Sequence, residues 1–343
     1  MRIDLHVHTR ESSAAPEYWL GELIGVQECY TPAESALAEA LRKGLDGVAI
    51  TNHDSADDAL RLARARPARV VPGCEYTVYA GRDRYVHVVA LGIDRGRHER
   101  LMHERSRGLA RFAGFCRGEG LVHFLAHPAW EVGREKRGIE PADLREWLEH
   151  FDVIESLNGN CQIENEIASG LARYFRKSRV GGSDAHDIDH IGSVWTEAEA
   201  DTPAEFLDRV RAGETAPGGT PTTHGEFTGA VRAIIGAFYR RELLKTFRGG
   251  SVGGYVAHAG IDGFLKTVIK FAILPAYFIV PQTASVAYLD KLRETAKRLR
   301  DRLIDALELD LAKSIASEKL GVEERSRRLL SGLRELSAAF GGE

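Results

Sequence analysis

The chain has 343 residues, of which 46 are Lys or Arg and 50 are Asp or Glu, so its formal net charge is -4. Hydrophobic residues make up 43% and charged residues 28%, a composition typical of a globular protein that excludes a collagen, a coiled coil and a disulfide scaffold. The four cysteines form no C-x-x-C pair, which argues against a zinc ribbon and fits a reducing compartment. The N-terminus has no apolar leader, so we expect a cytoplasmic protein.

Short apolar runs alternate with amphipathic stretches through about residue 215, as expected when crossover helices join the strands of a parallel sheet. Residues 31–34 and 202–205 both read Thr-Pro-Ala-Glu, which predicts a Thr cap, a Pro at the first helical position and a helix start. Seven units of a strand followed by a helix predict a barrel-like α/β domain over residues 1–220. In such a barrel the catalytic residues lie at the carboxyl ends of the strands. The predicted strands are residues 3–8, 47–51, 69–75, 85–92, 121–126, 152–157 and 180–184.

Residues 221–343 form a second predicted region that is mainly helical. Residues 264–280 are its most apolar segment, but they include two lysines and a proline and fall short of the ~20 residues that a membrane span needs. A buried or surface-lying helix is therefore favoured, and membrane contact is not expected. The heptad-like leucine spacing over residues 285–340 predicts helices packed as a hairpin or against a partner, which leaves a homo-oligomer open.

The first predicted strand carries alternating polar residues, Asp4, His6 and His8. The two-residue period of a strand projects all three side chains from one face. Two imidazoles and a carboxylate on one face present suitable ligands to a metal ion, whereas burying them unpaired would be costly. The alternative is a set of hydrogen-bonded polar groups in the core.

The next three strands each contribute one candidate ligand. His53 follows the second strand, although a turn or helix cap would explain the polar residues around it equally well. Glu75 ends the third strand, where a carboxylate can bridge two metals, and alone it is a weak signal. His87 interrupts an otherwise apolar fourth strand, so it either points into a site or is a satisfied core histidine.

Two later strands add further candidates. Pro128 ends the fifth strand where His127 reaches the rim, which favours His127 over the deeper His123. Asp184 and His186 form another alternating pair after two glycines that permit close approach of the chain. A packed barrel does not require so many His, Asp and Glu residues at its rim, and their combination predicts a metal centre.

Together these motifs resemble the PHP family, named for polymerase and histidinol phosphatase. The resemblance covers about residues 1–200 and rests on Asp4-Leu5-His6-Val7-His8-Thr9, His53-Asp54, Gly73-Cys74-Glu75, His87, Ala126-His127-Pro128 and Ser183-Asp184-Ala185-His186. It implies a distorted seven-stranded (β/α) barrel that hydrolyses phosphoesters with two or three divalent metal ions, usually Mn, Fe or Zn.

The resemblance also implies a role for each matching residue. The first metal would be held by His6, His8, Glu75 and Asp184, a second by Glu75, His87 and His127, and a third by His53 and His186. Glu75, Asp184 and His186 are expected to be catalytic, with a hydroxide shared by two metals attacking phosphorus while the cations neutralise charge.

The third site departs from the family pattern. The family often has an Asp or His a few residues after the first motif, but residues 10–14 read Arg-Glu-Ser-Ser-Ala, and Ser13 offers neither. Glu11 or Glu17 could substitute, or the third site could be weak or empty, so a dinuclear centre stays open.

The candidate substrate-binding residues are Arg10, Arg134 and Asn158. The two arginines lie in loops after rim motifs and could clamp phosphate oxygens, or they could be solvated loop charges. Asn158 follows the sixth strand and could line the cleft or shape a turn.

Three functions are compatible with these patterns. The leading hypothesis is a metal-dependent phosphoesterase that acts on a phosphomonoester or a nucleotide phosphate. An exonuclease on single-stranded nucleic acid is the alternative, because residues 225–343 carry 19 Lys or Arg against 14 Asp or Glu and could contact a phosphate backbone. A non-catalytic regulatory or membrane-surface module is the second alternative.

Overall fold

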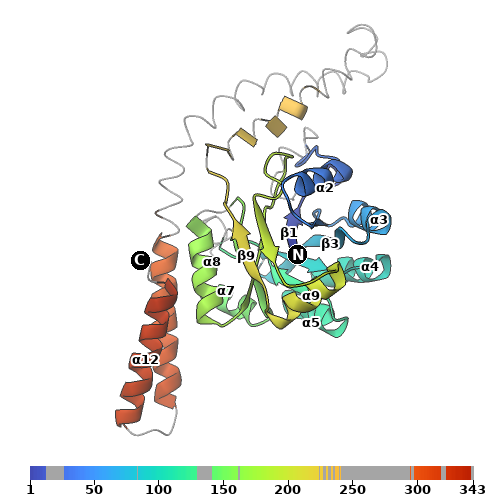
Figure 1. The fold of residues 1–343 in the computed structure, drawn as a ribbon. Coiled ribbons are helices and arrows are strands. Elements are labelled where there is room, and N and C mark those ends of the chain that lie inside the picture. Colours follow the sequence, from blue (N-terminus) through green and yellow to red (C-terminus); the bar gives the residue numbers. More distant parts are fainter. Residues whose placement is uncertain are drawn as a thin grey trace, which may run out of the picture.

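The computed structural model describes residues 1–12, 27–82, 84–129, 141–160, 163–223, 297–317 and 322–340, with residue 294 and scattered residues between 225 and 240. These residues contain a nine-stranded sheet in the order β7-β6-β5-β4-β3-β2-β1-β8-β9, with helices around its outside (Figure 1). The strands are β1 (Arg2–Val7), β2 (Gly47–Ile50), β3 (Val70–Gly81), β4 (Arg84–Leu91), β5 (Val122–Leu125), β6 (Val153–Asn158), β7 (Ser178–Gly182), β8 (Val194–Glu197) and β9 (Ala216–Gly219).

The helices alternate with these strands over most of the barrel. They are α2 (Ala33–Arg42), α3 (Asp57–Ala65), α4 (Arg95–Glu104), η1 (Arg105–Arg107), α5 (Leu109–Gly118), α7 (Pro141–Leu148), α8 (Ile163–Tyr174), α9 (Pro203–Ala212) and α12 (Val322–Phe340). The predicted cap at Thr202 is confirmed, since its side chain accepts a hydrogen bond from the backbone N–H of Glu205. The equivalent prediction at Thr31 is wrong. Pro32 occupies the N-cap position of α2 without a side-chain cap, and the Thr31 carbonyl instead accepts a bond from the Arg10 N–H.

The first and seventh strands close the sheet into a barrel. Val7 forms a parallel bridge with Ala185, just beyond the end of β7. The backbone N–H of His8 donates to the Ala185 carbonyl at 3.1 Å, and that of Asp184 donates to the His6 carbonyl at 2.7 Å. The predicted α/β barrel is therefore confirmed, and its closure brings the residues after β7 beside the end of β1.

The sequence predicted a parallel sheet, but only part of the observed sheet is parallel. β3 continues beyond the predicted end at Glu75 to Gly81, and β4 returns directly beside it as an antiparallel hairpin. A parallel connection needs a dozen or more residues, and the two-residue link leaves no room for a crossover helix. β4 also pairs antiparallel with β5, and β8 and β9 extend the sheet past β1.

The hairpin places His87 close to Glu75. In its register Thr77 lies opposite His87, and Glu75 lies opposite Val89. Residues two apart on a strand share a face, so Glu75 and His87 are diagonal neighbours on one face of the sheet. The antiparallel strand thus still delivers its histidine to the interior of the barrel.

The C-terminal helices form a hairpin that packs on the outside of α7 and α8 (Figure 1). Residues 297–317 and α12 lie against each other, since a Cβ at Gly332 would meet the Leu311 side chain at 2.5 Å. Leu303 and Leu336 join the same apolar core as Trp147 of α7. The predicted helical hairpin is confirmed, while packing against a partner and the division at residue 220 stay predictions.

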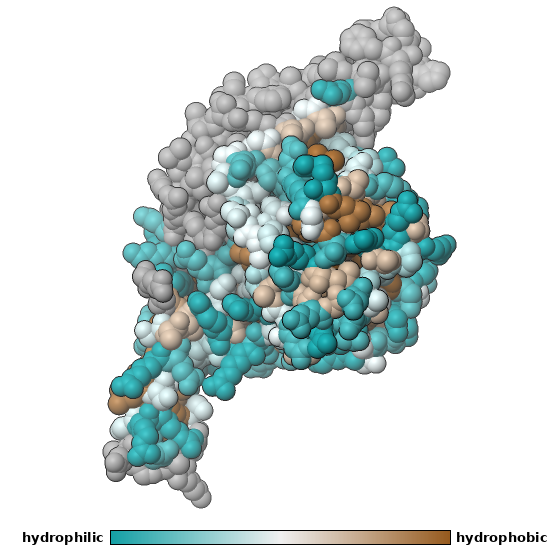
Figure 2. Space-filling view, viewed as in Figure 1, coloured by the Kyte–Doolittle hydropathy of each residue, from teal (hydrophilic) through white to brown (hydrophobic). Residues whose placement is uncertain are grey.

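The surface of the face in view is mainly hydrophilic, with apolar side chains gathered in small areas (Figure 2). Among the residues the structure describes, no helix is long and apolar enough to cross a membrane. The apolar segment at residues 264–280 lies outside the described residues.

We predict that Gly182→Ala will destabilise the barrel at its closure. A Cβ at Gly182 would lie 2.4 Å from the Cβ of His6, so β7 and β1 would have to separate. Overpacking of this kind typically costs about 1–3 kcal/mol of unfolding free energy, measurable by urea denaturation. Gly114→Ala is the matched control, because Gly114 is exposed in α5 with open space around it, and alanine there should stabilise by about 0.5–1 kcal/mol. An unchanged midpoint for Gly182→Ala would contradict the close approach.

Candidate metal centre

The mouth of the barrel gathers all eight side chains that the sequence nominated as metal ligands. They come from β1, β3, β4 and the segments after β1, β2, β5 and β7: His6, His8, His53, Glu75, His87, His127, Asp184 and His186. All are buried except His186, which is partly exposed. Nitrogen and oxygen atoms of these groups approach closely enough to form four overlapping sets that could hold a metal ion.

The Glu75 carboxylate lies at the middle of the cluster and faces two groups of imidazoles. Its Oε2 is 3.0 Å from Nε2 of His6 and 3.2 Å from Nε2 of His8. Its Oε1 is 3.3 Å from Nδ1 of His87 and 3.2 Å from Nε2 of His127. A carboxylate with each oxygen directed at a different donor group has the geometry of a bridging ligand.

Asp184 completes the first donor set. Its Oδ1 is 3.5 Å from Nε2 of His6 and 3.2 Å from Nε2 of His8. Ligands about 2.1 Å from a tetrahedral ion lie about 3.4 Å apart, so this spacing suits one shared cation. Nε2 of His8 is buried and makes no hydrogen bond within the described part of the chain, although Glu75 also lies beside it. These contacts are the ones expected between ligands of one ion.

Buried hydrogen bonds orient the first two imidazoles. Nδ1 of His6 lies 2.9 Å from Oε1 of Glu155 in β6, and Nδ1 of His8 lies 3.1 Å from Oγ of Ser12. With Nδ1 engaged in this way, each ring directs Nε2 toward the cluster, as outer hydrogen bonds do for histidine ligands generally. Glu155 also accepts the backbone N–H of His127 at 2.7 Å, so one carboxylate positions two members of the cluster.

Two candidate ligands have an unusual backbone conformation. His127 has φ 26° and Asp184 has φ 52°, in the left-handed region that favours glycine. Such residues cost on the order of 1–3 kcal/mol each and persist where the surrounding structure requires them, often at functional sites. Here the conformation turns both side chains toward Glu75 and His6 at the points where their strands end.

The buried charges compensate one another. Burial alone would raise the pKa of Glu75, but His53, His6 and His87 bring it well below its ordinary value. The pKa of Asp184 is likewise held well below its ordinary value, against the effect of burial, by His6 and His8. Burial lowers the pKa of His8, which keeps that ring neutral. Ionised carboxylates and a neutral imidazole are the forms that bind a divalent cation.

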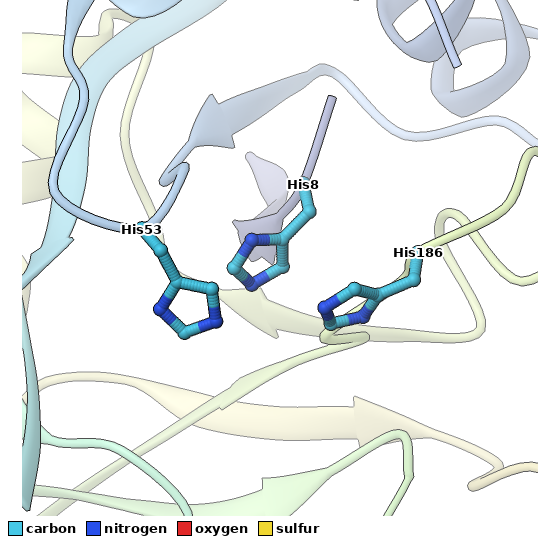
Figure 3. Close-up of side chains that lie close together, drawn as sticks. All are labelled: His8, His53 and His186. Carbon is cyan, nitrogen blue, oxygen red and sulfur yellow. The ribbon is translucent and has the colours of Figure 1, made fainter. Parts of the chain in front are cut away.

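A third group of donors lies nearer the rim. Figure 3 shows the rings of His8, His53 and His186 converging, and the rings of His8 and His186 stack with centroids 4.2 Å apart. Oε1 of Glu28 is 3.0 Å from Nε2 of His186 and 3.5 Å from Nε2 of His53. Glu28 was not among the residues that the sequence nominated.

Glu28 lies farther from the first motif than Glu11 and Glu17, the two acids that the sequence suggested for the third site. Glu11 is exposed, and Glu17 lies outside the described residues. The sequence does contain one indication of its role, because Glu28 lies four residues before Pro32, the N-cap residue of α2. In a βα unit the segment before each helix runs along the catalytic rim, so an acidic residue there could reach the mouth of the barrel.

Asn158 lies behind the carboxylates and is fully buried. Its Nδ2 donates to Glu155 at 3.0 Å and reaches Oδ2 of Asp184 at 3.3 Å, and its Oδ1 accepts the backbone N–H of Asn160. This arrangement favours a role in positioning the carboxylates, and contact with substrate stays a prediction. Arg10 is exposed, and Arg134 lies outside the described residues, so their substrate-binding roles also stay predictions.

Asp4 shares the inward face of β1 but serves the backbone. It accepts hydrogen bonds from the N–H groups of Ser183 and Gly192, both at 2.8 Å, and so ties β1 to the segment after β7. Burial raises its pKa to about 6. His123 lies apart from the cluster, with its ring against Phe151, in agreement with the preference for His127.

One sequence family matches part of the chain. The sequence model described as PHP-associated matches residues 162–215, which include Asp184 and His186. This match confirms the resemblance to the PHP superfamily that the rim motifs predicted. No curated protein matches the chain significantly.

The solved structures that match this chain include the following three. A two-domain protein of Bacteroides vulgatus that contains a predicted PHP-like metal-dependent phosphoesterase is 15% identical, with TM-score 0.48 over 64% of this chain and 65% of its own length. An amidohydrolase of Chromobacterium violaceum is 18% identical, with TM-score 0.43 over 62% of this chain and 97% of that one. A lesion-specific endonuclease of Pyrococcus furiosus is 15% identical, with TM-score 0.39 over 63% and 58%. Likeness at this level carries no argument about chemistry.

We predict that Glu155→Gln will weaken metal binding without unfolding the barrel. The variant keeps the shape of the side chain but removes the negative charge beside Nδ1 of His6. Loss of such a partner typically lowers metal affinity about 10–100-fold, which a Zn²⁺ titration with a competing chelator would measure. Glu166→Gln, an exposed carboxylate of α8, is the control. Equal affinities for both variants would show that Glu155 does not tune the site.

We predict that metal binding at pH 7 releases protons. Although burial opposes it, Glu28 and Asp184 raise the pKa of His186 from 6.5 to about 9, so the metal-free protein holds a proton there at pH 7. The pKa of His6 is also raised, by Glu75 and Asp184, against the effect of burial. A metal needs the nitrogen lone pair, so binding expels these protons. Calorimetry in buffers of different ionisation enthalpy should show their release, and enthalpies independent of buffer would refute it.

Proposed function

We propose that this protein is a metal-dependent phosphoesterase that hydrolyses a phosphomonoester or a nucleotide phosphate at the mouth of the barrel. The observation that carries the proposal is the buried Glu75 carboxylate, whose two oxygens face separate groups of imidazoles. Two cations held a short distance apart by such a bridge form the arrangement that phosphatases and nucleases use for phosphoryl displacement. The match to the PHP-associated family supports the same class of chemistry.

We propose two metal positions in this cluster. The first would be held by His6, His8, Glu75 and Asp184, and the second by Glu75, His87 and His127. Imidazole and carboxylate ligands suit Mn, Fe and Zn alike. When bound, divalent ions supply positive charge to phosphoryl oxygens and lower the pKa of water at the site.

The protein itself supplies position and charge balance. Glu155 and Ser12 orient the imidazoles of His6 and His8, and the barrel buries these rings completely. Nδ1 of His186 lies 2.9 Å from the backbone carbonyl of Asp184, and Nε2 faces Glu28 at 3.0 Å. Glu75, Asp184 and His186 are therefore the residues we propose as catalytic, because each would contact the ions or the substrate phosphate.

The C-terminal hairpin gives no specific support to the exonuclease alternative. Two exposed arginines of its described helices pair with acids on the same helix, Arg298 with Glu294 and Arg327 with Glu324. Such pairing reduces the positive charge that these two arginines can offer to a phosphate backbone. The retained donor set at the barrel mouth argues against a purely regulatory module.

We predict that His6→Ala and Asp184→Asn will each abolish turnover of phosphoester substrates. Each variant removes one ligand of the first position, and a metal contributes several kcal/mol of transition-state stabilisation, so loss of at least about a hundredfold is expected. The assay would present a phosphomonoester, a phosphodiester, a 3',5'-bisphosphate nucleotide and single-stranded RNA to Mn²⁺- or Zn²⁺-loaded protein.

His123→Gln is the matched control, since His123 is a buried histidine outside the cluster and its loss should leave turnover intact. Activity that survives His6→Ala would refute the assignment of the centre. Turnover of one substrate class by the wild type, lost in the two variants, would identify the substrate type.

A further inference from the structure

Glu28 reaches the cluster from a segment that is fastened to the end of β1. Sγ of Cys29 donates to the carbonyl of His8 at 3.4 Å, and the Arg10 N–H donates to the carbonyl of Thr31 at 2.8 Å. The side chain of Gln27 adds a bond to the Arg10 carbonyl. Contacts on both sides of Glu28 thus reach His8 and Arg10, in the segment that directly follows β1.

The Glu28 carboxylate lies among imidazoles rather than beside a permanent cation. Oε1 contacts Nε2 of both His53 and His186, and its side chain is only 13% exposed. Oε2 is buried and accepts no hydrogen bond from the described residues. Burial would raise the pKa of Glu28, but the two histidines hold it well below its ordinary value, so the group is charged.

The remaining nitrogens of the two histidines are already directed elsewhere. Nδ1 of His186 faces the carbonyl of Asp184 at 2.9 Å, and Nδ1 of His53 lies 3.2 Å from Oε2 of Glu75. Each ring therefore presents Nε2 to the space in front of Glu28. Two imidazole nitrogens and one carboxylate oxygen are the three protein ligands of a common type of catalytic zinc site, in which the fourth position stays open.

We infer that Glu28 is the carboxylate ligand of a third divalent metal site, with His53 and His186 as the other two ligands. The inference rests on the proposed function, and it supplies the acidic ligand that residues 10–14 lack. His186 has the most exposed side chain of the cluster, at 19%, whereas Glu28 at 13% is close to Asp184 at 12%. The third site would therefore lie at the side of the cluster where His186 meets solvent, so that a phosphoryl oxygen of the substrate could reach it.

Glu28→Gln tests the inference through metal content instead of activity. The variant keeps the size of the side chain but loses the charge, so we expect it to retain one equivalent fewer of Mn²⁺ than the wild type. The measurement is metal-to-protein ratio by plasma mass spectrometry after saturation and gel filtration. Glu11→Gln is the matched control, because Glu11 is the exposed acid next to the first motif.

The outcomes separate the inference from the function on which it rests. Wild-type protein that binds three equivalents, with only Glu28→Gln reduced to two, supports Glu28 as a ligand. Equal metal content in the wild type and Glu28→Gln would overturn the third site while leaving a dinuclear phosphoesterase intact, and Glu28 would then be an ion-pair partner of His186. A reduction in Glu11→Gln alone would assign the ligand to Glu11. Wild-type protein that binds no metal would instead refute the proposed function.

An anomalous difference map from Mn²⁺-soaked crystals gives an independent readout. The expected peak for the third ion lies between Glu28 and His186 and is absent in Glu28→Gln crystals, while peaks beside Glu75 remain. A third peak that persists unchanged in the variant would overturn the inference even if metal ratios were ambiguous.

Discussion

The structure of the barrel mouth depends on one buried carboxylate, Glu75. A fully buried charge is tolerated only when other charges and hydrogen bonds compensate its lost hydration. The compensating groups come from four strands or strand ends, because imidazoles of His6, His8, His53, His87 and His127 all lie within 3.3 Å of its oxygens. Removing Glu75 would leave these rings without their common partner, so the site and the local fold depend on the same residue.

The fold and the site also meet at the closure of the barrel. The Asp184 N–H bonds to the His6 carbonyl across the junction of β7 and β1, while the Asp184 carboxylate faces the His6 ring. Gly182 permits this approach, and Asp4 holds the following segment through its backbone. The first donor set therefore exists only when the barrel is closed, which couples metal binding to the global fold.

Much of this arrangement followed from sequence periodicity, and the failures have identifiable physical causes. Alternation in residues 3–8 and the apolar run at 85–92 located their strands well, because burial on a strand leaves a two-residue signature. The direction of β4 depends on loop length, which the apolar pattern alone does not reveal. Glu28 and Glu155 act through contacts distant in sequence, with His186 and His6, and no local pattern encodes such pairs.

The cluster is graded from a dry interior to a wetter rim, and this gradient orders its chemistry. His6, His8 and Glu75 are fully buried, so the negative charge of Glu75 acts through a low effective dielectric and attracts a cation strongly. His186, with a side chain 19% exposed, lies closer to solvent, where charges are better screened. On the proposed function, a substrate phosphate that enters from the rim would meet His186 first and the Glu75 carboxylate last.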